Sequence, residues 1–174
     1  MVYYQQPFMA SLLLKIHPDS VLRRKAEPIK AIELHKPELQ QLFLDMEQTM
    51  DDNDGIGLAA PQVGKSIQLA VIKTKDGALA LANPKITRFS LRQEFGEEGC
   101  LSIPGVYGSV KRSRTIRVRA LDRRGKKLNF KASGLFARVI QHEIDHLNGI
   151  LFIDKAVEIT MGKDILAFTE KSKN

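Results

Sequence analysis

The chain of 174 residues has one cysteine, no internal repeat, no linker and no apolar run long enough to span a membrane. Its lone cysteine, Cys100, cannot form a disulfide within the chain, so the fold must be stabilised by its core. The apolar run at residues 8–14 is short and follows no basic residue, and the first 14 residues lack arginine. These absences argue against a signal peptide and against a mitochondrial transit peptide.

The residues that are present suit one folded domain. Hydrophobic residues make up 43% of the chain, which argues against disorder. A chain of this length can also bury a proper core. We expect a single domain over residues 1–174, with an N-terminal extension at residues 1–11 and a C-terminal helix and tail at residues 155–174.

The most informative segment is His142-Glu143-Ile144-Asp145-His146. On a helix, residues four apart lie on the same face, so both imidazoles can reach one metal ion. Glu143 can reach a water molecule held there without being a ligand itself. This H-E-x-x-H pattern is typical of metal-dependent amide hydrolases. The alternative is a surface helix that carries two histidines and two acids by chance.

Local signals place the motif on a helix. Ser133 is an N-cap candidate, and Asn148-Gly149 supplies a left-handed C-cap. Between them, apolar residues at helical spacing predict a buried stripe made of Leu135, Phe136, Val139, Ile140, Ile144 and Leu147. Both histidines border this stripe, where unsatisfied ring nitrogens are costly, and this favours a metal.

The residues alone do not identify the third metal ligand. A catalytic site of this kind usually has three protein ligands, and no histidine follows His146. The candidates are two downstream acids, Asp154 and Glu158, and Cys100 in the segment EGCLS at 98–102. The alternative for Cys100 is a small buried side chain in the core.

A glycine-rich segment, GIGLAAPQVG at 55–64, supplies further context. Glycines let the backbone approach a ligand closely, and Gln62 is a polar side chain in an otherwise apolar stretch. The segment lacks the ending and the spacing of phosphate-binding loops. The alternative is a tight connection between a helix and a strand.

With these three segments the chain resembles the peptide deformylase family. The motifs of that family are GφGφAAxQ, EGCxS and HExxH, where φ is apolar. They occur here in order, as GIGLAAPQ at 55–62, EGCLS at 98–102 and HEIDH at 142–146. The resemblance extends from about Leu12 to Asp154. It implies a hydrolase that removes the formyl group from the N-terminal formyl-methionine of newly synthesised polypeptides and releases formate.

The resemblance also implies the groups that do the chemistry. Cys100, His142 and His146 would hold one divalent ion per chain, with Fe(II) as the physiological metal and zinc, nickel or cobalt as substitutes. The ion lowers the pKa of a water molecule, and Glu143 takes the water proton and delivers it to the departing amine. The Gln62 side-chain amide and the Leu101 backbone N–H would form the oxyanion hole.

Substrate binding needs an apolar pocket and backbone hydrogen bonds. Motif position and helix face make Ile56, Leu135 and Val139 candidates for the methionine pocket, with ordinary core packing as the alternative. The resemblance implies that the Gly57 backbone pairs with the peptide like a strand. Gly105, Val106 and Tyr107 are candidates for the rim of the cleft.

Positive charge is concentrated in one stretch, within a chain of net charge +7. Its members are Lys111, Arg112, Arg114, Arg117, Arg119, Arg123, Arg124, Lys126 and Lys127. They are read either as solvent-facing residues of a strand and a charged turn, or as a basic face that attracts an anionic partner. A deformylase works on nascent chains, so we expect the ribosome surface as a weak partner, and no membrane.

The remaining patterns predict an α+β fold, with mainly antiparallel short sheets packed around a central metal-binding helix and a C-terminal helix. A helical stripe follows Pro37, and residues 67–72 and 79–82 are strand candidates, the second broken by Asn83-Pro84. Ile116, Val118 and Ala120 alternate with arginines as in a half-buried strand, and residues 122–125 predict a hairpin turn.

Two other functions compete with deformylation. One is an endopeptidase, which the missing downstream histidine and the intact cysteine motif count against. The other is a metal-stabilised module that binds ribosomal RNA without catalysis; a structural zinc site normally has four protein ligands, and only three are identified. We expect a bacterial cytoplasmic protein, with an organellar location as the alternative.

Overall fold

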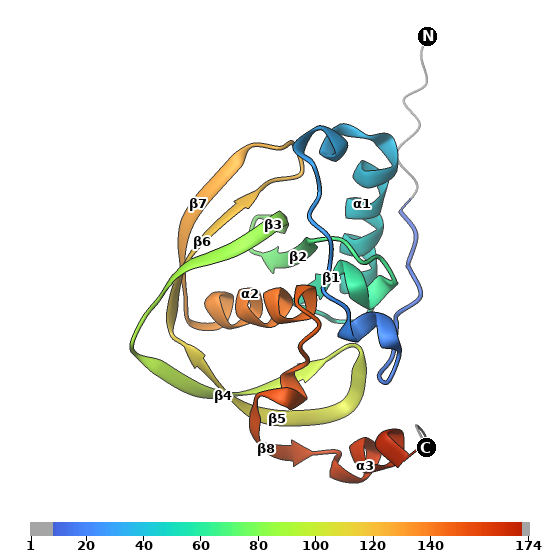
Figure 1. Cartoon of the computed structure of the whole chain (residues 1–174), viewed down its shortest axis with the longest axis vertical. Coiled ribbons are helices and arrows are strands. Elements are labelled where there is room, and N and C mark those ends of the chain that lie inside the picture. The colour runs from blue at the N-terminus through green and yellow to red at the C-terminus, as the bar shows by residue number, and fades with distance from the viewer. Residues whose placement is uncertain (1–8, 172–174) are drawn as a thin grey trace.

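Two antiparallel sheets enclose one long helix in the computed structural model, which describes residues 9–171 (Figure 1). Five strands form the first sheet in the order β1-β2-β3-β6-β7, and three form the second in the order β4-β5-β8. The strands are β1 (Gly57–Ala59), β2 (Leu69–Thr74), β3 (Gly77–Phe89), β4 (Gln93–Cys100), β5 (Ile103–Ser113), β6 (Thr115–Leu121), β7 (Lys127–Ser133) and β8 (Ala156–Met161). The predicted α+β class is confirmed.

Three α-helices and several short 3-10 helices complete the described chain. The α-helices are α1 (Pro37–Asp52), α2 (Gly134–Leu147) and α3 (Lys163–Lys171). The 3-10 helices are η1 (Ser20–Arg23), η2 (Ala31–His35), η3 (Ala60–Val63) and η4 (Phe152–Asp154). None of the helices within residues 9–171 is long and apolar enough to cross a membrane.

Helix α2 lies between the two sheets, with its apolar face toward the larger one (Figure 1). Ala137, Val139 and Ile140 of α2 pack with buried residues of β2, β3, β6 and β7. The helix begins after Ser133, whose side chain makes no capping hydrogen bond, and ends at Asn148 and the left-handed Gly149. Leu135 was expected in the buried stripe but is 66% exposed, because the first turn of α2 lies at the surface.

The hairpin predicted at residues 115–133 is confirmed, since β6 pairs with β7 along its full length. Ile116, Val118 and Ala120 face the core, and Arg117 and Arg119 face solvent. The Asp122 carboxylate accepts hydrogen bonds from the backbone N–H groups of Arg124 and Lys126 and so closes the turn.

The break predicted at Asn83-Pro84 was wrong, because β3 continues through it to Phe89. Asn83 adopts a left-handed backbone (φ +50°), and the register against β6 shifts between Ala82 and Lys85. Its amide closes two hydrogen bonds with the Ile29 backbone, donating to the carbonyl (2.7 Å) and accepting from the N–H (2.8 Å). An irregularity in the strand therefore anchors the segment that leads into η2.

The predicted C-terminal helix is present as α3, but residues 155–174 are not helix and tail alone. Strand β8 precedes α3 and pairs with β5 at the edge of the small sheet. Val157, Ile159 and Met161 alternate with polar residues as in a strand, a signal that the prediction of helix and tail alone did not use.

Replacing Asn83 with alanine should lower the free energy of unfolding by about 3 kcal/mol, because two backbone groups of Ile29 lose their partners. Urea unfolding measures this. The control Asn129→Ala, at an exposed position of β7, should change stability by no more than about 0.5 kcal/mol. Equal effects of the two substitutions would show that the Asn83 contacts are not stabilising.

Candidate metal centre

Three potential ligand atoms converge beside α2. His142 and His146 lie one turn apart on the helix, and Cys100 ends β4 opposite them. The Nε2 atoms of the two histidines are 3.2 Å apart, and Cys100 Sγ is 3.2 Å from His146 Nε2. Cys100, His142 and His146 thus form a group whose ligand atoms all lie within 4.8 Å of one another.

This spacing fits a shared metal ion. Zinc-like ions bind imidazole nitrogen at about 2.0–2.1 Å and thiolate at about 2.3 Å, so tetrahedral ligands lie about 3.3–3.6 Å from one another. The separations in the structure are close to these values. Three protein ligands leave one position for water or substrate, which is the arrangement of a catalytic site and not of a structural one.

Each histidine is held in a distinct protonation environment. Burial and the neighbouring His142 lower the pKa of His146 well below its usual value, so this ring is in the neutral form that binds metals. Burial also lowers the pKa of His142, but hydrogen bonds to Cys100 and Glu98 outweigh it and raise the pKa to about 10. A proton and a metal ion therefore compete for the ring nitrogen of His142 that faces the other ligands.

Glu98 determines the orientation of the first histidine. Its Oε2 lies 2.9 Å from His142 Nδ1, which fixes the ring so that Nε2 points at Cys100 and His146. A carboxylate on the far nitrogen selects the tautomer and makes the ligand nitrogen more basic. Glu98 was not among the residues predicted for the site, although it begins the segment EGCLS.

Glu98 is itself held by two arginines. Arg112 of β5 binds it at two points (2.8 and 2.9 Å), and Arg138 of α2 donates a third hydrogen bond (2.8 Å). Burial would raise the pKa of Glu98, but hydrogen bonds from Arg112 and His142 hold it well below its usual value. Arg112 also pairs with Asp145, which binds Lys155 as well (2.6 Å).

The burial of Arg112 corrects the interpretation of the basic stretch. This guanidinium is only 4% exposed, and it belongs to the network behind the metal ligands. Arg114 pairs with Glu94 at 2.9 Å, and the Lys111 ammonium lies 5.5 Å from the centre of the Phe95 ring. Arg112 therefore does not belong to a basic surface, whereas the other members of the stretch are exposed.

Glu143 is buried beside the histidines, with 4% of its surface exposed. Burial raises its pKa to about 7, against the opposing effect of His142. Its Oε2 has no hydrogen-bond partner within residues 9–171. A side chain at Gly57 would collide with the Glu143 carboxylate and with Val139, so this glycine makes room for the acid. A carboxyl group that titrates near neutrality can take up and return a proton.

Gln62 extends its amide toward the same place from η3. Its Oε1 accepts a hydrogen bond from the Ala59 N–H (2.8 Å), which leaves Nε2 to donate. Nε2 lies 3.2 Å from Ser102 Oγ and 3.4 Å from Cys100 Sγ. Leu101 follows Cys100 in the turn from β4 to β5. The structure thus places a side-chain amide close to Cys100, which the turn backbone of Leu101 follows directly.

A cleft of about 580 Å³ opens onto these groups. The other residues predicted for substrate binding line it, namely Ile56, Gly57, Leu135 and Val139, and so do the predicted rim residues Gly105, Val106 and Tyr107. Ile56 and Leu135 are 48% and 66% exposed, whereas Val139 is buried. An apolar wall with a few polar groups at one end is typical of a small-ligand site.

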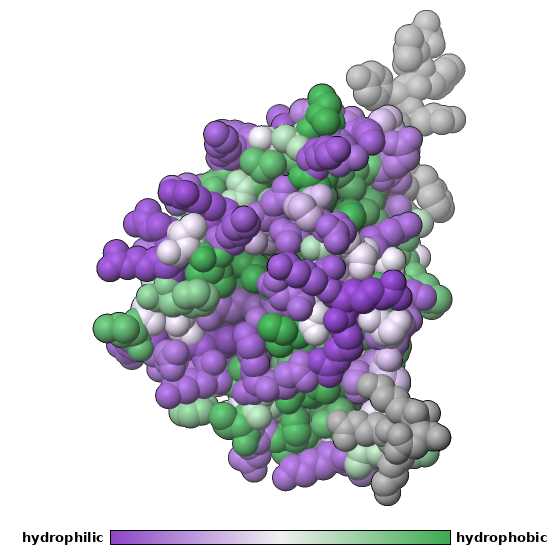
Figure 2. All heavy atoms as spheres, viewed as in Figure 1, coloured by the Kyte–Doolittle hydropathy of each residue, from purple (hydrophilic) through white to green (hydrophobic). Residues whose placement is uncertain are grey.

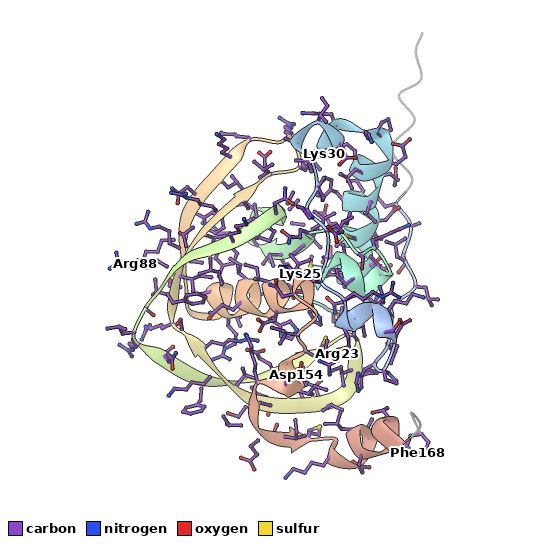
Figure 3. The ribbon with its side chains drawn as sticks, viewed as in Figure 1. Arg23, Lys25, Lys30, Arg88, Asp154 and Phe168 are labelled. Atoms are coloured by element: carbon purple, nitrogen blue, oxygen red, sulfur yellow. The ribbon has the colours of Figure 1, made fainter. Side chains whose placement is uncertain are left out.

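Neither acid considered as a third ligand belongs to the group of ligand atoms found within residues 9–171. Asp154 pairs with Arg23 and accepts a hydrogen bond from the Leu151 N–H (2.8 Å); Figure 3 shows Asp154 and Arg23 side by side. Glu158 is exposed on β8.

Comparison with known proteins finds similarity to peptide deformylases in both a family model and individual sequences. The model of the polypeptide deformylase family matches residues 12–161. The peptide deformylase of Thermoanaerobacter pseudethanolicus is 50% identical over 139 residues, which are 80% of this chain and 85% of that protein. Peptide deformylase 1 of Bacillus anthracis is 49% identical over 149 residues, or 84% of this chain and 93% of that protein.

The solved structures that resemble this fold are also peptide deformylases. A class I type b peptide deformylase from Acinetobacter baumannii with Met-Ala-Ser bound has a TM-score of 0.81 and 35% identity, over 85% of this chain and 99% of that chain. The peptide deformylase of Thermotoga maritima has a TM-score of 0.80 and 39% identity, over 84% of this chain and 97% of that chain.

Changing Glu98 to glutamine should weaken metal binding by about 10–100-fold, because His142 loses the carboxylate that orients it. Competition with a chelator measures the zinc dissociation constant. The control is Glu97→Gln, which removes the exposed neighbouring carboxylate and should leave zinc affinity unchanged. Unchanged affinity in Glu98→Gln would show that the ligands are positioned without it.

Proposed function

The chain belongs to the polypeptide deformylase family. From this premise we propose which residues bind the metal, transfer protons and stabilise the oxyanion. The activity is removal of the formyl group from the N-terminal methionine of newly synthesised polypeptides, with release of formate. The observation that carries the assignment of roles is the convergence of Cys100, His142 and His146 at the end of the cleft. These three residues would hold one divalent ion.

The ion supplies Lewis acidity, which lowers the pKa of water and polarises the formyl carbonyl. Glu143 is the general base and acid in this proposal. Its carboxyl is buried, has an oxygen without a partner within residues 9–171, and has a pKa of about 7. It would accept the proton of the attacking water and return it to the amine that departs.

Gln62 and Leu101 would stabilise the negative charge that develops on the formyl oxygen. The Gln62 amide is fixed by its hydrogen bond to Ala59, so the donor Nε2 is already oriented before substrate arrives. Leu101 would contribute its backbone N–H from the turn after Cys100. Donors that are oriented in advance stabilise an oxyanion without the cost of reorganisation.

The peptide would bind as an added strand on the edge of β1. Within residues 9–171, strand β1 pairs with β2 alone, and the Lys73 N–H donates to the Ile56 carbonyl on that side (3.0 Å). Backbone groups alternate between the two sides of an antiparallel strand, so those of Gly57 face the free edge. That edge lines the cleft, as addition of a peptide strand requires.

The methionine side chain would lie against Ile56, Leu135 and Val139 of the cleft. The Acinetobacter baumannii enzyme holds Met-Ala-Ser, a peptide with methionine at its amino end. A peptide of this kind is the product expected here. The exposed Ile56 and Leu135 side chains would lose contact with water when it binds, which favours association.

The setting proposed for this activity is the bacterial cytoplasm, with the ribosome as a weak partner. The relatives named above are bacterial. The substrate is a nascent chain, and the solvent-facing cations of β6 and the turn after it would attract ribosomal RNA by long-range electrostatics. Residues 1–174 would act as a single domain.

Changing Glu143 to glutamine should lower kcat for formate release from formyl-Met-Ala-Ser by at least about a hundredfold, because the base is lost. Metal content should stay unchanged, since Glu143 is not a ligand. Glu158→Gln, at an exposed position of β8, is the control and should keep full activity. Near-normal turnover in Glu143→Gln would remove this residue from the mechanism.

Changing Gln62 to alanine should lower kcat by about 10²–10³-fold through loss of one oxyanion donor, with metal content preserved. Gln62→Glu keeps an acceptor for the Ala59 N–H but removes the donor, and it should be as inactive as the alanine variant. Recovery of activity in Gln62→Glu would mean that Gln62 acts only by holding Ala59.

Fe(II) is the proposed physiological ion, with nickel and cobalt as good substitutes and zinc as a poor one. A thiolate beside an open coordination position makes Fe(II) sensitive to oxygen, so protein purified in air should contain mostly zinc and have low activity. Anaerobic loading with Fe(II), or loading with Ni(II), should raise kcat/KM for formyl-Met peptides. Equal activity per bound ion for all metals would contradict the iron preference.

A further inference from the structure

The outer face of β3, β6 and β7 carries positive charges in register. Arg88 of β3 is opposite Arg117 of β6, which is opposite Lys131 of β7. In the next row, Lys85 is opposite Arg119. All five side chains are exposed, and the other face of this sheet packs on α2.

Like charges placed directly across neighbouring strands destabilise a sheet. Strands lie about 4.8 Å apart, so the cations of one row repel one another at short range. None of the five takes part in an ion pair within residues 9–171, whereas Lys73, Arg92 and Arg114 all have carboxylate partners there. No carboxylate within residues 9–171 therefore neutralises the positive charge of the two rows, and an anionic partner would do so.

A hollow adjoins the row of three cations. Its volume is about 340 Å³, and it is lined by Arg88, Phe89, Ser90, Leu91, Thr115, Ile116, Arg117 and Lys131. Phe89 and Leu91 are 56% and 102% exposed. Figure 2 shows hydrophilic side chains over the region of β6 and β7, with hydrophobic ones at the edge where β3 leads into β4. Cations and an exposed aromatic ring thus meet at one concave place.

We propose that this face binds a single-stranded segment of RNA, a proposal that rests on the proposed function at the ribosome. The rows of Lys85, Arg88, Arg117, Arg119 and Lys131 would contact phosphates, and one base would enter the hollow against Phe89. Proteins that bind single strands combine a positive track with aromatic rings on which bases stack. The Phe89 ring lines the hollow beside the three cations, which suits a stacked base with its phosphates; attachment to a lipid surface through the fully exposed Leu91 is the outcome that the vesicle measurement below distinguishes.

The surface is separate from the deformylase cleft. None of the residues of the hollow lines the cleft beside Cys100 and His142. In Figure 3, Arg88 projects outward from β3, on the opposite side of the molecule from Phe168 of α3. Substitutions on this face should consequently leave formate release unchanged, and RNA binding can be measured independently of catalysis.

The first test is fluorescence anisotropy of a short labelled oligouridylate with the metal-loaded full chain. The triple variant Arg88→Gln/Arg117→Gln/Lys131→Gln should bind at least about tenfold more weakly, with a salt slope lower by about 2. The matched control, Lys25→Gln/Lys75→Gln/Lys163→Gln, removes the same three charges from the net +7 at exposed sites elsewhere. It should retain most of the affinity.

The second test concerns stacking. Phe89→Ala should weaken oligouridylate binding by about tenfold with an unchanged salt slope, because a base loses its platform. Phe168→Ala, which removes an exposed ring of α3, should have no effect. Unchanged melting temperatures of all the variants establish that the effects are not due to unfolding.

Three results would overturn the proposal. One is equal weakening by the two triple variants, which would show attraction by net charge alone. Another is absence of oligouridylate binding by a protein that releases formate normally. The third is loss of binding to phosphatidylglycerol vesicles in the Arg88 triple variant without any RNA binding, which would assign the face to a membrane. RNA binding by a protein that releases no formate would contradict the proposed function and leave this inference standing.

Discussion

The buried carboxylate of Glu98 is the interaction on which the metal site depends. It binds Arg112 at two points, Arg138 at a third and His142 at a fourth, and so joins β4, β5 and α2. A buried ion pair is tolerated only when its remaining hydrogen-bonding groups are satisfied. Loss of Glu98 would leave Arg112 with Asp145 alone and would remove from Arg138 the one carboxylate it pairs with within residues 9–171. The junction of the small sheet with the central helix is therefore also the support of the metal ligands.

The same helix performs two tasks on two faces. Ala137, Ile140 and Leu147 of α2 are buried in the core, whereas His142 lines the cleft and the buried His146 lies beside it and Cys100. The absence of a side chain at Gly57 lets β1 lie close to the Glu143 carboxylate, which is largely buried at the wall of the cleft. This burial raises the pKa of Glu143. Packing between the large sheet and α2 thus determines the acid–base properties of the proposed catalytic group.

Local sequence patterns allowed several elements of the fold and most residues of the candidate site to be predicted. The helix of residues 134–147, the β6–β7 hairpin and the three motifs each depend on neighbours in sequence, where spacing and turn chemistry are informative. Arg112 could not be predicted to be buried, because within an alternating, arginine-rich strand it looks like a solvent-facing cation. Its position follows from the register in which Glu94 pairs with Arg112 and Glu98 with Gly108, a long-range pairing that no local pattern determines. The pairing of β8 with β5 and the register shift at Asn83 against β6 are likewise long-range features.

The central claim is that Cys100, His142 and His146 bind one ion and leave a position open. X-ray absorption spectroscopy of the zinc-loaded protein tests it most directly. We expect one sulfur scatterer at about 2.3 Å and two imidazole nitrogens at about 2.0–2.1 Å, with one further light atom that a product-like peptide or an inhibitor perturbs. A spectrum without sulfur, or with a fourth protein ligand that does not respond to added ligand, would contradict the account.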